Sequence, residues 1–227
     1  MHPVGDTLEA RVLEVQERIA VAATAAGRDP ADITTIVVTK FHPAKLVRDL
    51  YALGVRHVGE NRHQEAVAKH EEVADLDLTW HFIGQLQSNK ARAVAEYARV
   101  IHSLDRPSLV SALSSQDRQV DVFIEINVTD VPGRGGVLPQ ELEALCDLVL
   151  QAPVLNLRGV MAVAPVDEEP ARAFERVLGY AARVRAMAPA ARDLSIGMSG
   201  DFEEAIAVGA THLRIGTAIT GKRPTDA

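Results

Sequence analysis

Lys40 is the first residue of the chain whose type and position suggest chemistry. It closes the segment ITTIVVTK, in which residues 33–38 are four β-branched aliphatics and two threonines. This composition predicts a strand buried on both faces, as in parallel sheets. Lysine is seldom fully buried, so its aliphatic stem could simply lie along the strand end with the ammonium group in water. A lysine partly shielded from water could instead supply a neutral amine, which forms Schiff bases with aldehydes.

A second group of residues has the composition of a phosphate site. Ser199 and Gly200 precede the helical pattern DFEEAIAVG, and Gly216 and Thr217 follow the last predicted strand. Hydroxyl groups and backbone N–H groups at such positions bind phosphate. A simpler interpretation is a helix N-cap at Ser199 and an ordinary turn at Gly216. Arg214, two residues before Gly216, points the same way as that glycine in a regular strand and could reach into the same site. The simpler interpretation of Arg214 is a salt bridge with a carboxylate.

The rest of the chain predicts the elements that would bring these residues together. Strand-like runs alternate with helical patterns, and the strands are expected near residues 33–39, 57–59, 79–83, 100–103, 121–128, 157–163, 194–198 and 212–216. A leading helix is expected after a cap at Asp6 or Thr7. Eight strands, each followed by a helix, suit a closed barrel, and 227 residues are close to its usual size. An open doubly wound sheet is the alternative, although no glycine-rich fingerprint follows the first strand. We therefore predict an α/β protein, a (β/α)8 TIM-type barrel preceded by an N-terminal helix, as a single domain over residues 1–227.

Composition and charge exclude several classes of partner. The net charge of −7 and the 4% aromatic content argue against nucleic-acid binding. The sequence has no apolar run of membrane-spanning length and no signal peptide pattern, so a cytoplasmic location is expected. Cys146 is the only cysteine, which rules out a disulfide framework within the chain. No metal site is predicted.

The barrel hypothesis links the lysine to the phosphate site. Functional residues of such barrels lie at the C-terminal ends of the strands, and phosphate often binds at the loops after strands seven and eight. Lys40 would then face this phosphate site across the mouth, which suits a ligand with both an aldehyde and a phosphate, such as pyridoxal 5′-phosphate. Arg214 could reach the pyridine nitrogen. Because a guanidinium group only donates hydrogen bonds, it would keep that nitrogen unprotonated and restrain carbanion chemistry.

Five motifs carry a resemblance to a known family. The segments VVTKFHP, HVGENRHQE, WHFIGQLQSNK, LRGVMAV and GMSGDFEEAIAVGATHLRIGTAITGKR occur in this order between about Ile33 and Arg223. Together they resemble the pyridoxal phosphate homeostasis proteins, single-barrel relatives of the alanine racemase N-terminal domain. The resemblance implies a cofactor on Lys40, a pyridine nitrogen facing Arg214, and further contacts from Asn61, Ser199, Gly200, Ile215, Gly216 and Thr217. The sequence departs from the family where Arg134 and Gly135 replace a lysine that precedes serine and glycine in many members.

Three functions are compatible with such a site. The first is a cofactor carrier or buffer that does not act as an enzyme. Such a carrier could supply apoenzymes that need pyridoxal phosphate. We expect a monomer, and a dimer remains an alternative. The second is an amino-acid racemase, whose second base would be a tyrosine on the opposite face of the cofactor. Tyr51, Tyr97 and Tyr180 all fall in predicted outer helices, away from the mouth. The third is a Schiff-base aldolase acting on a sugar phosphate. Glu60 and His81, near neighbouring strand ends, are expected to form a supporting hydrogen-bond layer.

Overall fold

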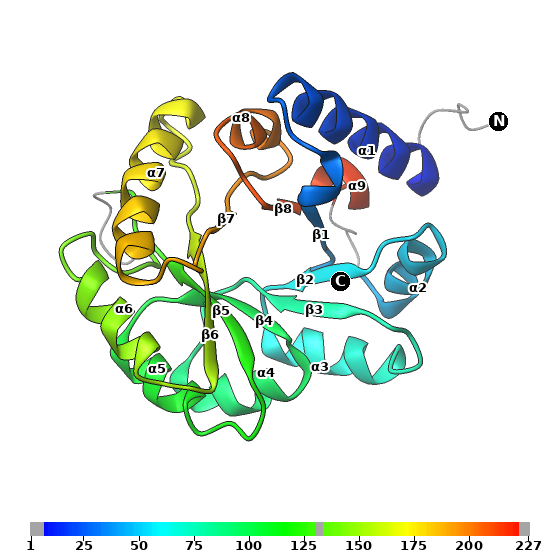
Figure 1. The fold of residues 1–227 in the computed structure, drawn as a ribbon. Coiled ribbons are helices and arrows are strands. Elements are labelled where there is room, and N and C mark those ends of the chain that lie inside the picture. Colours follow the sequence, from blue (N-terminus) through cyan, green and yellow to red (C-terminus); the bar gives the residue numbers. More distant parts are fainter. Residues whose placement is uncertain (1–6, 130–133, 223–227) are drawn as a thin grey trace.

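The chain forms a closed barrel of eight parallel strands, each neighbouring the next in sequence order (Figure 1). The computed structural model describes residues 7–129 and 134–222. The strands are β1 (Thr34–Val38), β2 (His57–Glu60), β3 (Thr79–Phe82), β4 (Val100–Leu104), β5 (Val120–Glu125), β6 (Leu155–Met161), β7 (Asp193–Ser195) and β8 (His212–Ile215). Pairing of β1 with β8 closes the sheet. The predicted (β/α)8 barrel is confirmed, and the open doubly wound alternative is wrong.

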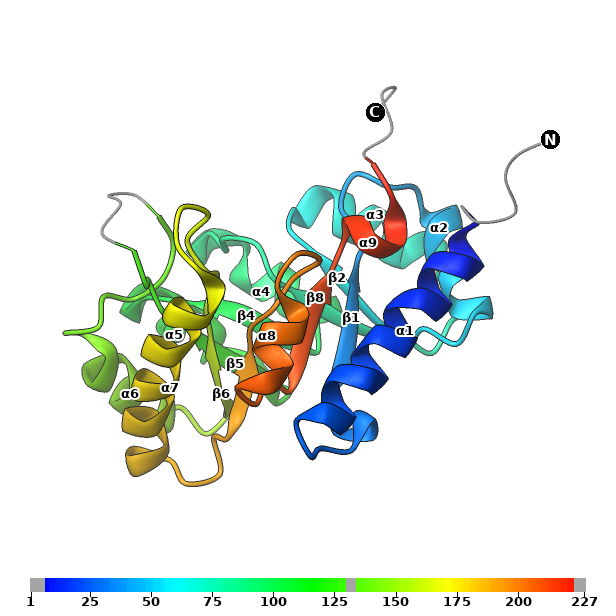
Figure 2. The ribbon, with the colours of Figure 1, turned by 90° about the horizontal axis from the view of Figure 1, so that it is seen from above.

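Helices surround the barrel on the outside (Figures 1 and 2). The α-helices are α1 (Leu8–Ala25), α2 (Ala44–Ala52), α3 (His63–Glu72), α4 (Ala91–Tyr97), α5 (Pro107–Leu113), α6 (Leu142–Leu150), α7 (Pro170–Met187), α8 (Phe202–Ala207) and α9 (Thr217–Thr220). Two 3₁₀ turns, η1 (Pro30–Asp32) and η2 (Ser88–Lys90), precede β1 and α4. Within the described residues, no helix is both long and apolar enough to cross a membrane.

The leading helix α1 forms where the sequence predicts it. Thr7 is its N-cap, and the Thr7 hydroxyl accepts a hydrogen bond from the N–H of Ala10 at 3.1 Å; Asp6, the other predicted cap, lies outside the described residues. The apolar face of α1 is buried and consists of Val12, Val15, Ile19 and Ala23. Their spacing places these side chains on one side of a helix of 3.6 residues per turn. This face packs against the barrel wall next to α8 and α9.

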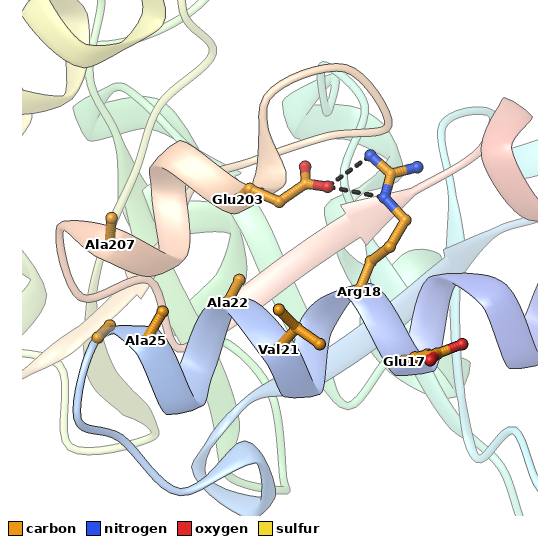
Figure 3. Close-up of a pocket in the computed structure, with 8 residues that line it drawn as sticks. Glu17, Arg18, Val21, Ala22, Ala25, Glu203 and Ala207 are labelled. Atoms are coloured by element: carbon orange, nitrogen blue, oxygen red, sulfur yellow. Dashed lines mark hydrogen bonds and ion pairs between the residues drawn. The ribbon is translucent and has the colours of Figure 1, made fainter.

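Polar contacts connect α1 to α8 and α9. Arg18 forms an ion pair with Glu203 of α8 at 2.5 Å, and Arg11 Nε donates to the carbonyl of Ile219 in α9 at 2.7 Å. Beside the ion pair, the two helices leave a surface groove of about 700 Å³, whose apolar lining includes Val21 and Ala207 (Figure 3). None of its lining residues belongs to the mouth of the barrel.

The structure differs from the predicted elements mainly after β5 and β7. β5 ends at Glu125 rather than near residue 128, because Ile126 pairs only through an isolated bridge to Val137. β7 ends at Ser195 because Gly197, at φ = 90°, takes a left-handed conformation that a regular strand does not allow. The four-residue helix α9 was not predicted, since its sequence TAIT has no helical period.

Candidate cofactor site

All seven predicted site residues line one cavity at the C-terminal ends of the strands. The cavity measures about 380 Å³ and is lined by Lys40, Asn61, Ser199, Gly200, Arg214, Gly216 and Thr217 together with Val38, Ile83, Val163 and Met198. A few convergent polar groups between apolar walls are typical of a small-ligand site. The apolar side chains would contact a flat ring, while the polar groups hold its substituents.

Lys40 lies at the rim of the cavity, two residues beyond the end of β1. Its side chain is exposed, with Nζ at 5.8 Å from the centroid of the Phe41 ring. Phe41 has φ = 67°, a left-handed conformation that is rare for an aromatic residue, and its N–H donates to Glu65 at 3.1 Å. Backbone strain of this kind is often found next to functional groups.

A buried ion pair supports the backbone immediately before Lys40. Lys69 Nζ, on α3, donates to the Thr39 carbonyl at 2.7 Å and to Glu60 Oε1 at 2.5 Å. The Thr39 hydroxyl donates to the same Glu60 oxygen at 2.6 Å, and Glu60 is completely buried. Burial raises the pKa of Glu60, whereas Lys69 acts in the opposite direction. Glu60 therefore belongs to a supporting layer under the strand end, as the sequence predicts.

Ser199 occupies the position expected of a phosphate ligand. Its hydroxyl oxygen accepts the backbone N–H groups of Gly216 and Ala218, each at 3.2 Å. The N-cap of α8 is Asp201, so the simpler interpretation of Ser199 as that cap is wrong. Next to Ser199, a Cβ placed on Gly200 would have no atom within 4 Å. A hydroxyl group close to two backbone N–H groups, next to a glycine with open space around it, fits a phosphate group.

Arg214 is buried beneath the cavity floor. Nη1 donates to the carbonyl oxygen and to the hydroxyl of Ser195 at 2.6 and 2.7 Å, and Nη2 donates to the Ala162 carbonyl at 3.0 Å. Burial lowers the pKa of Arg214 to about 10, while the negative charge of Glu125 opposes the shift. Within residues 7–129 and 134–222 Arg214 forms no ion pair, so the salt-bridge interpretation is wrong. Its remaining donor capacity suits a ring nitrogen that accepts a hydrogen bond.

Asn61 follows β2 on another wall of the cavity. Its Oδ1 is buried, with no hydrogen-bond partner among the described residues. The backbones of Gly84 and Asn61 approach closely, because a Cβ on Gly84 would lie 2.1 Å from the backbone carbonyl oxygen of Asn61. Unpaired buried acceptors are uncommon in folded proteins. One at a cavity wall fits a site where a bound ligand completes the hydrogen bonding.

Sequence reasoning missed two charged residues near the mouth. Glu125 closes β5, and burial, together with the charge of Asp105, raises its pKa to about 7. An acidic residue within the apolar run VFIEI was the available signal. Lys69 lies on the inner face of α3 with Ala66, so a lysine within an apolar stripe was the corresponding signal. Arg134, where the sequence departs from the resembled family, lines a neighbouring polar cavity of about 190 Å³ together with Glu125; residues 130–133 of the same segment lie outside the described residues.

Comparison with known proteins assigns this barrel to a class. Residues 14–224 match the family model described as alanine racemase, N-terminal domain. The class is therefore that of the alanine racemase N-terminal barrels. Within it, the pyridoxal phosphate homeostasis protein of Pseudomonas aeruginosa is 42% identical, with 96% of both chains covered. That of Escherichia coli K12 is 40% identical, with 92% of this chain and 94% of the relative covered. The chain belongs to the pyridoxal phosphate homeostasis protein family.

Solved structures agree with this assignment. PipY of Synechococcus elongatus PCC7942 has been solved without PLP, with a TM-score of 0.80 and 37% identity over 91% of this chain and 100% of PipY. The form with PLP bound gives a TM-score of 0.79 and 38% identity at the same coverage. Alanine racemase from Corynebacterium glutamicum gives a TM-score of 0.69 at 19% identity, with 94% of this chain and 61% of the racemase covered. At this level of identity, the comparison with the racemase shows a shared fold and nothing more.

Proposed function

We propose that this chain binds pyridoxal 5′-phosphate as a Schiff base on Lys40 and acts in intracellular homeostasis of the cofactor, as a carrier or buffer without robust turnover. The observation that carries the proposal is the convergence of all seven predicted residues on one cavity. Family membership adds to it, because the relatives are named for this cofactor. PLP-dependent apoenzymes are the proposed recipients, and we propose a single-domain protein that acts as a monomer.

Each side of the cavity has a proposed role. Ser199 and Thr217, with the backbone of Gly200 and Gly216, bind the phosphate, and Arg214 donates a hydrogen bond to the pyridine nitrogen. When bound, the cofactor would supply an electrophilic aldehyde carbon, and Lys40 would supply the amine. The protein itself contributes binding and orientation.

The supply of acid and base groups argues against robust catalysis. A two-base racemisation requires a proton donor or acceptor on each face of the cofactor. Tyr51, Tyr97 and Tyr180 lie on α2, α4 and α7, and none of them lines the cavity. A guanidinium donor at the ring nitrogen also leaves the ring a poor electron sink. Both features favour a carrier over the racemase alternative.

The test is an absorption spectrum of the purified protein with added pyridoxal 5′-phosphate, before and after borohydride, followed by peptide mass mapping. We expect a visible imine band and, after reduction, a phosphopyridoxyl group on Lys40. Lys40→Ala should abolish the adduct. Lys45→Ala is the matched control, because Lys45 is an exposed lysine only five residues away, and it should leave the adduct intact. An unchanged imine band in Lys40→Ala would refute the assignment.

Carrier and enzyme are separated by incubating the loaded protein with amino acids. A carrier leaves L-alanine unchanged in configuration, whereas sustained formation of D-alanine would favour the racemase. Arg214→Glu should speed half-transamination of amino acids, because it allows the ring nitrogen to become protonated. An unchanged rate would contradict the proposed role of Arg214.

A further inference from the structure

A chain of hydrogen bonds runs through the barrel interior to Arg214. His57 Nδ1 lies 3.0 Å from His81 Nε2, and His81 Nδ1 lies 2.9 Å from His102 Nε2. His102 Nδ1 lies 2.8 Å from Ser195 Oγ, which also accepts a hydrogen bond from Arg214 at 2.7 Å. His81, His102 and Ser195 are buried. Three histidines and one serine therefore connect β2, β3, β4 and β7 to the arginine on β8.

Arg214 sets the direction of every hydrogen bond in this chain. A guanidinium group has no acceptor, so Arg214 must donate to Ser195. A buried hydroxyl hydrogen without an acceptor is costly, and among the described residues the other partner of the Ser195 hydroxyl is His102, so His102 Nδ1 accepts that hydrogen. A neutral His102 then carries its hydrogen on Nε2 and donates to His81. The same reasoning makes His81 donate to His57, so all three imidazoles carry the hydrogen on Nε2.

The surroundings keep these imidazoles neutral. Burial lowers the pKa of both His81 and His102 well below the ordinary histidine value, and burial also lowers the pKa of His57. A fourth histidine, His212 on β8, has its ring centroid 6.4 Å from that of His81. Burial lowers the pKa of His212 to about 4, Asp193 opposes that shift, and Arg158 and Arg214 add to it. Proton uptake by His102 or His212 would place a positive charge near Arg214, which disfavours it further.

The series of hydrogen bonds ends at His57, at the N-terminal end of the barrel strands. His57 is the first residue of β2 and is half-buried. It lines a cavity of about 350 Å³ whose walls come mainly from the N-terminal ends of the strands. Thr34, Thr79 and His212, the first residues of their strands, also line it, with Arg99, Asp121 and Arg158 among the remaining lining residues. Arg214 lines the cavity at the opposite end of the barrel, so the chain spans the interior from one end to the other.

We propose that His57, His81, His102 and Ser195 are positioning residues for Arg214, and that their one-directional hydrogen bonds hold the guanidinium group in place beneath the cofactor cavity. The hydroxyl hydrogen of Ser195 is bound by His102, so the lone pairs of Ser195 stay turned toward Arg214. The effect of these residues on cofactor binding rests on the proposed function. The direction of the hydrogen bonds is independent of that function.

The direction is tested by NMR of the cofactor-free protein labelled with ¹⁵N-histidine. We expect His57, His81 and His102 to be neutral with the hydrogen on Nε2, and the hydrogens on His81 and His102 to exchange slowly. The Nδ1 signal of His102 should move to the position of a free acceptor in Ser195→Ala. Ser103→Ala is the matched control: Ser103 is a buried serine on β4 whose hydroxyl has no partner among the described residues. A hydrogen on Nδ1, or a charged imidazole, at any of the three positions would overturn the proposal.

The positioning role is tested by titrating both variants with pyridoxal 5′-phosphate and following the imine band. Ser195→Ala should weaken binding about two- to tenfold, the loss that corresponds to one hydrogen bond. Ser103→Ala should bind like the parent protein. Equal affinity of the two variants would overturn the positioning role even if the tautomers are as expected. If the parent protein forms no imine band, the proposed function fails, while the NMR result still decides the direction of the chain.

Discussion

Replacement of Lys69 by methionine tests how the strand end that carries Lys40 is held. Methionine keeps most of the side-chain volume but removes the donor to Glu60 and to the Thr39 carbonyl. Glu60 would then keep only the Thr39 hydroxyl, because its Oε2 has no partner among the described residues. Removing one member of a buried ion pair destabilises a protein by about 3–5 kcal/mol. We expect Lys69→Met to lower the free energy of unfolding at pH 7.5 by about that amount.

The pH dependence gives this prediction a second signature. Burial already raises the pKa of Glu60, and Lys69 is the largest opposing influence. Without Lys69 the pKa rises further, so Glu60 holds its proton to a higher pH in the folded variant than in the unfolded chain. The stability deficit should therefore shrink as the pH is lowered toward the ordinary glutamate pKa, where Glu60 becomes neutral in both states.

The assay is urea unfolding followed by the fluorescence of Trp80, the single tryptophan, which is buried in β3. Lys69→Met combined with Glu60→Gln should recover much of the loss, because no charge then remains buried. Lys45→Met is the control, since the exposed pair of Lys45 with Asp49 contributes at most about 0.5 kcal/mol. A loss below about 1 kcal/mol for Lys69→Met, or no recovery in the double variant, would refute the reasoning.

Three further predictions concern other described residues. Ser199→Ala should weaken pyridoxal 5′-phosphate binding about tenfold in a spectroscopic titration, the loss that corresponds to a hydrogen bond to a charged group; unchanged affinity would remove Ser199 from the phosphate site. Glu125→Gln should stabilise the protein by up to about 3 kcal/mol in urea unfolding at pH 8 but not at pH 4.5. The buried carboxyl has a pKa of about 7, so the native protein carries the destabilising charge at pH 8 and not at pH 4.5. An equal gain at both pH values would contradict this. Cys146, with a pKa raised to about 11 by burial, should react with a thiol reagent at pH 8 only after unfolding, and rapid labelling of the native protein would show that it is accessible.

Much of the barrel could be predicted because its signal is local. The β-branched run before Lys40 and the apolar face of α1 each identify an element without knowledge of its partners. The residues at the strand ends follow from the barrel, because parallel strands place their C-terminal ends together. The motifs then assigned roles to Lys40, Ser199 and Arg214, and the structure brings these three to one cavity.

The unpredicted parts depend on contacts between distant segments. Ser195 gives no signal in the sequence, since its importance comes from His102, which lies 93 residues away in the chain. Lys69 lies on the same face of α3 as Ala66, but its role depends on Glu60 and on the Thr39 carbonyl, which it contacts only in the folded barrel. Packing partners at such separations determine burial and hydrogen bonding, and periodicity along the chain does not contain them.

The packing of α1 against α8 and α9 has a consequence for synthesis of the protein. A ribosome makes α1 long before α8 and α9, the helices that bind Arg18 and Arg11. The apolar face of α1 must therefore remain without these partners for most of translation, when exposed apolar surface favours aggregation. Closure of β8 onto β1 and docking of α1 against α8 and α9 can both be completed only after the last strand has been made. Removal of α1, or of α8 and α9, breaks the same contacts. Nascent and shortened forms therefore expose apolar surface at the same place, where α1 packs against α8 and α9 in the folded protein.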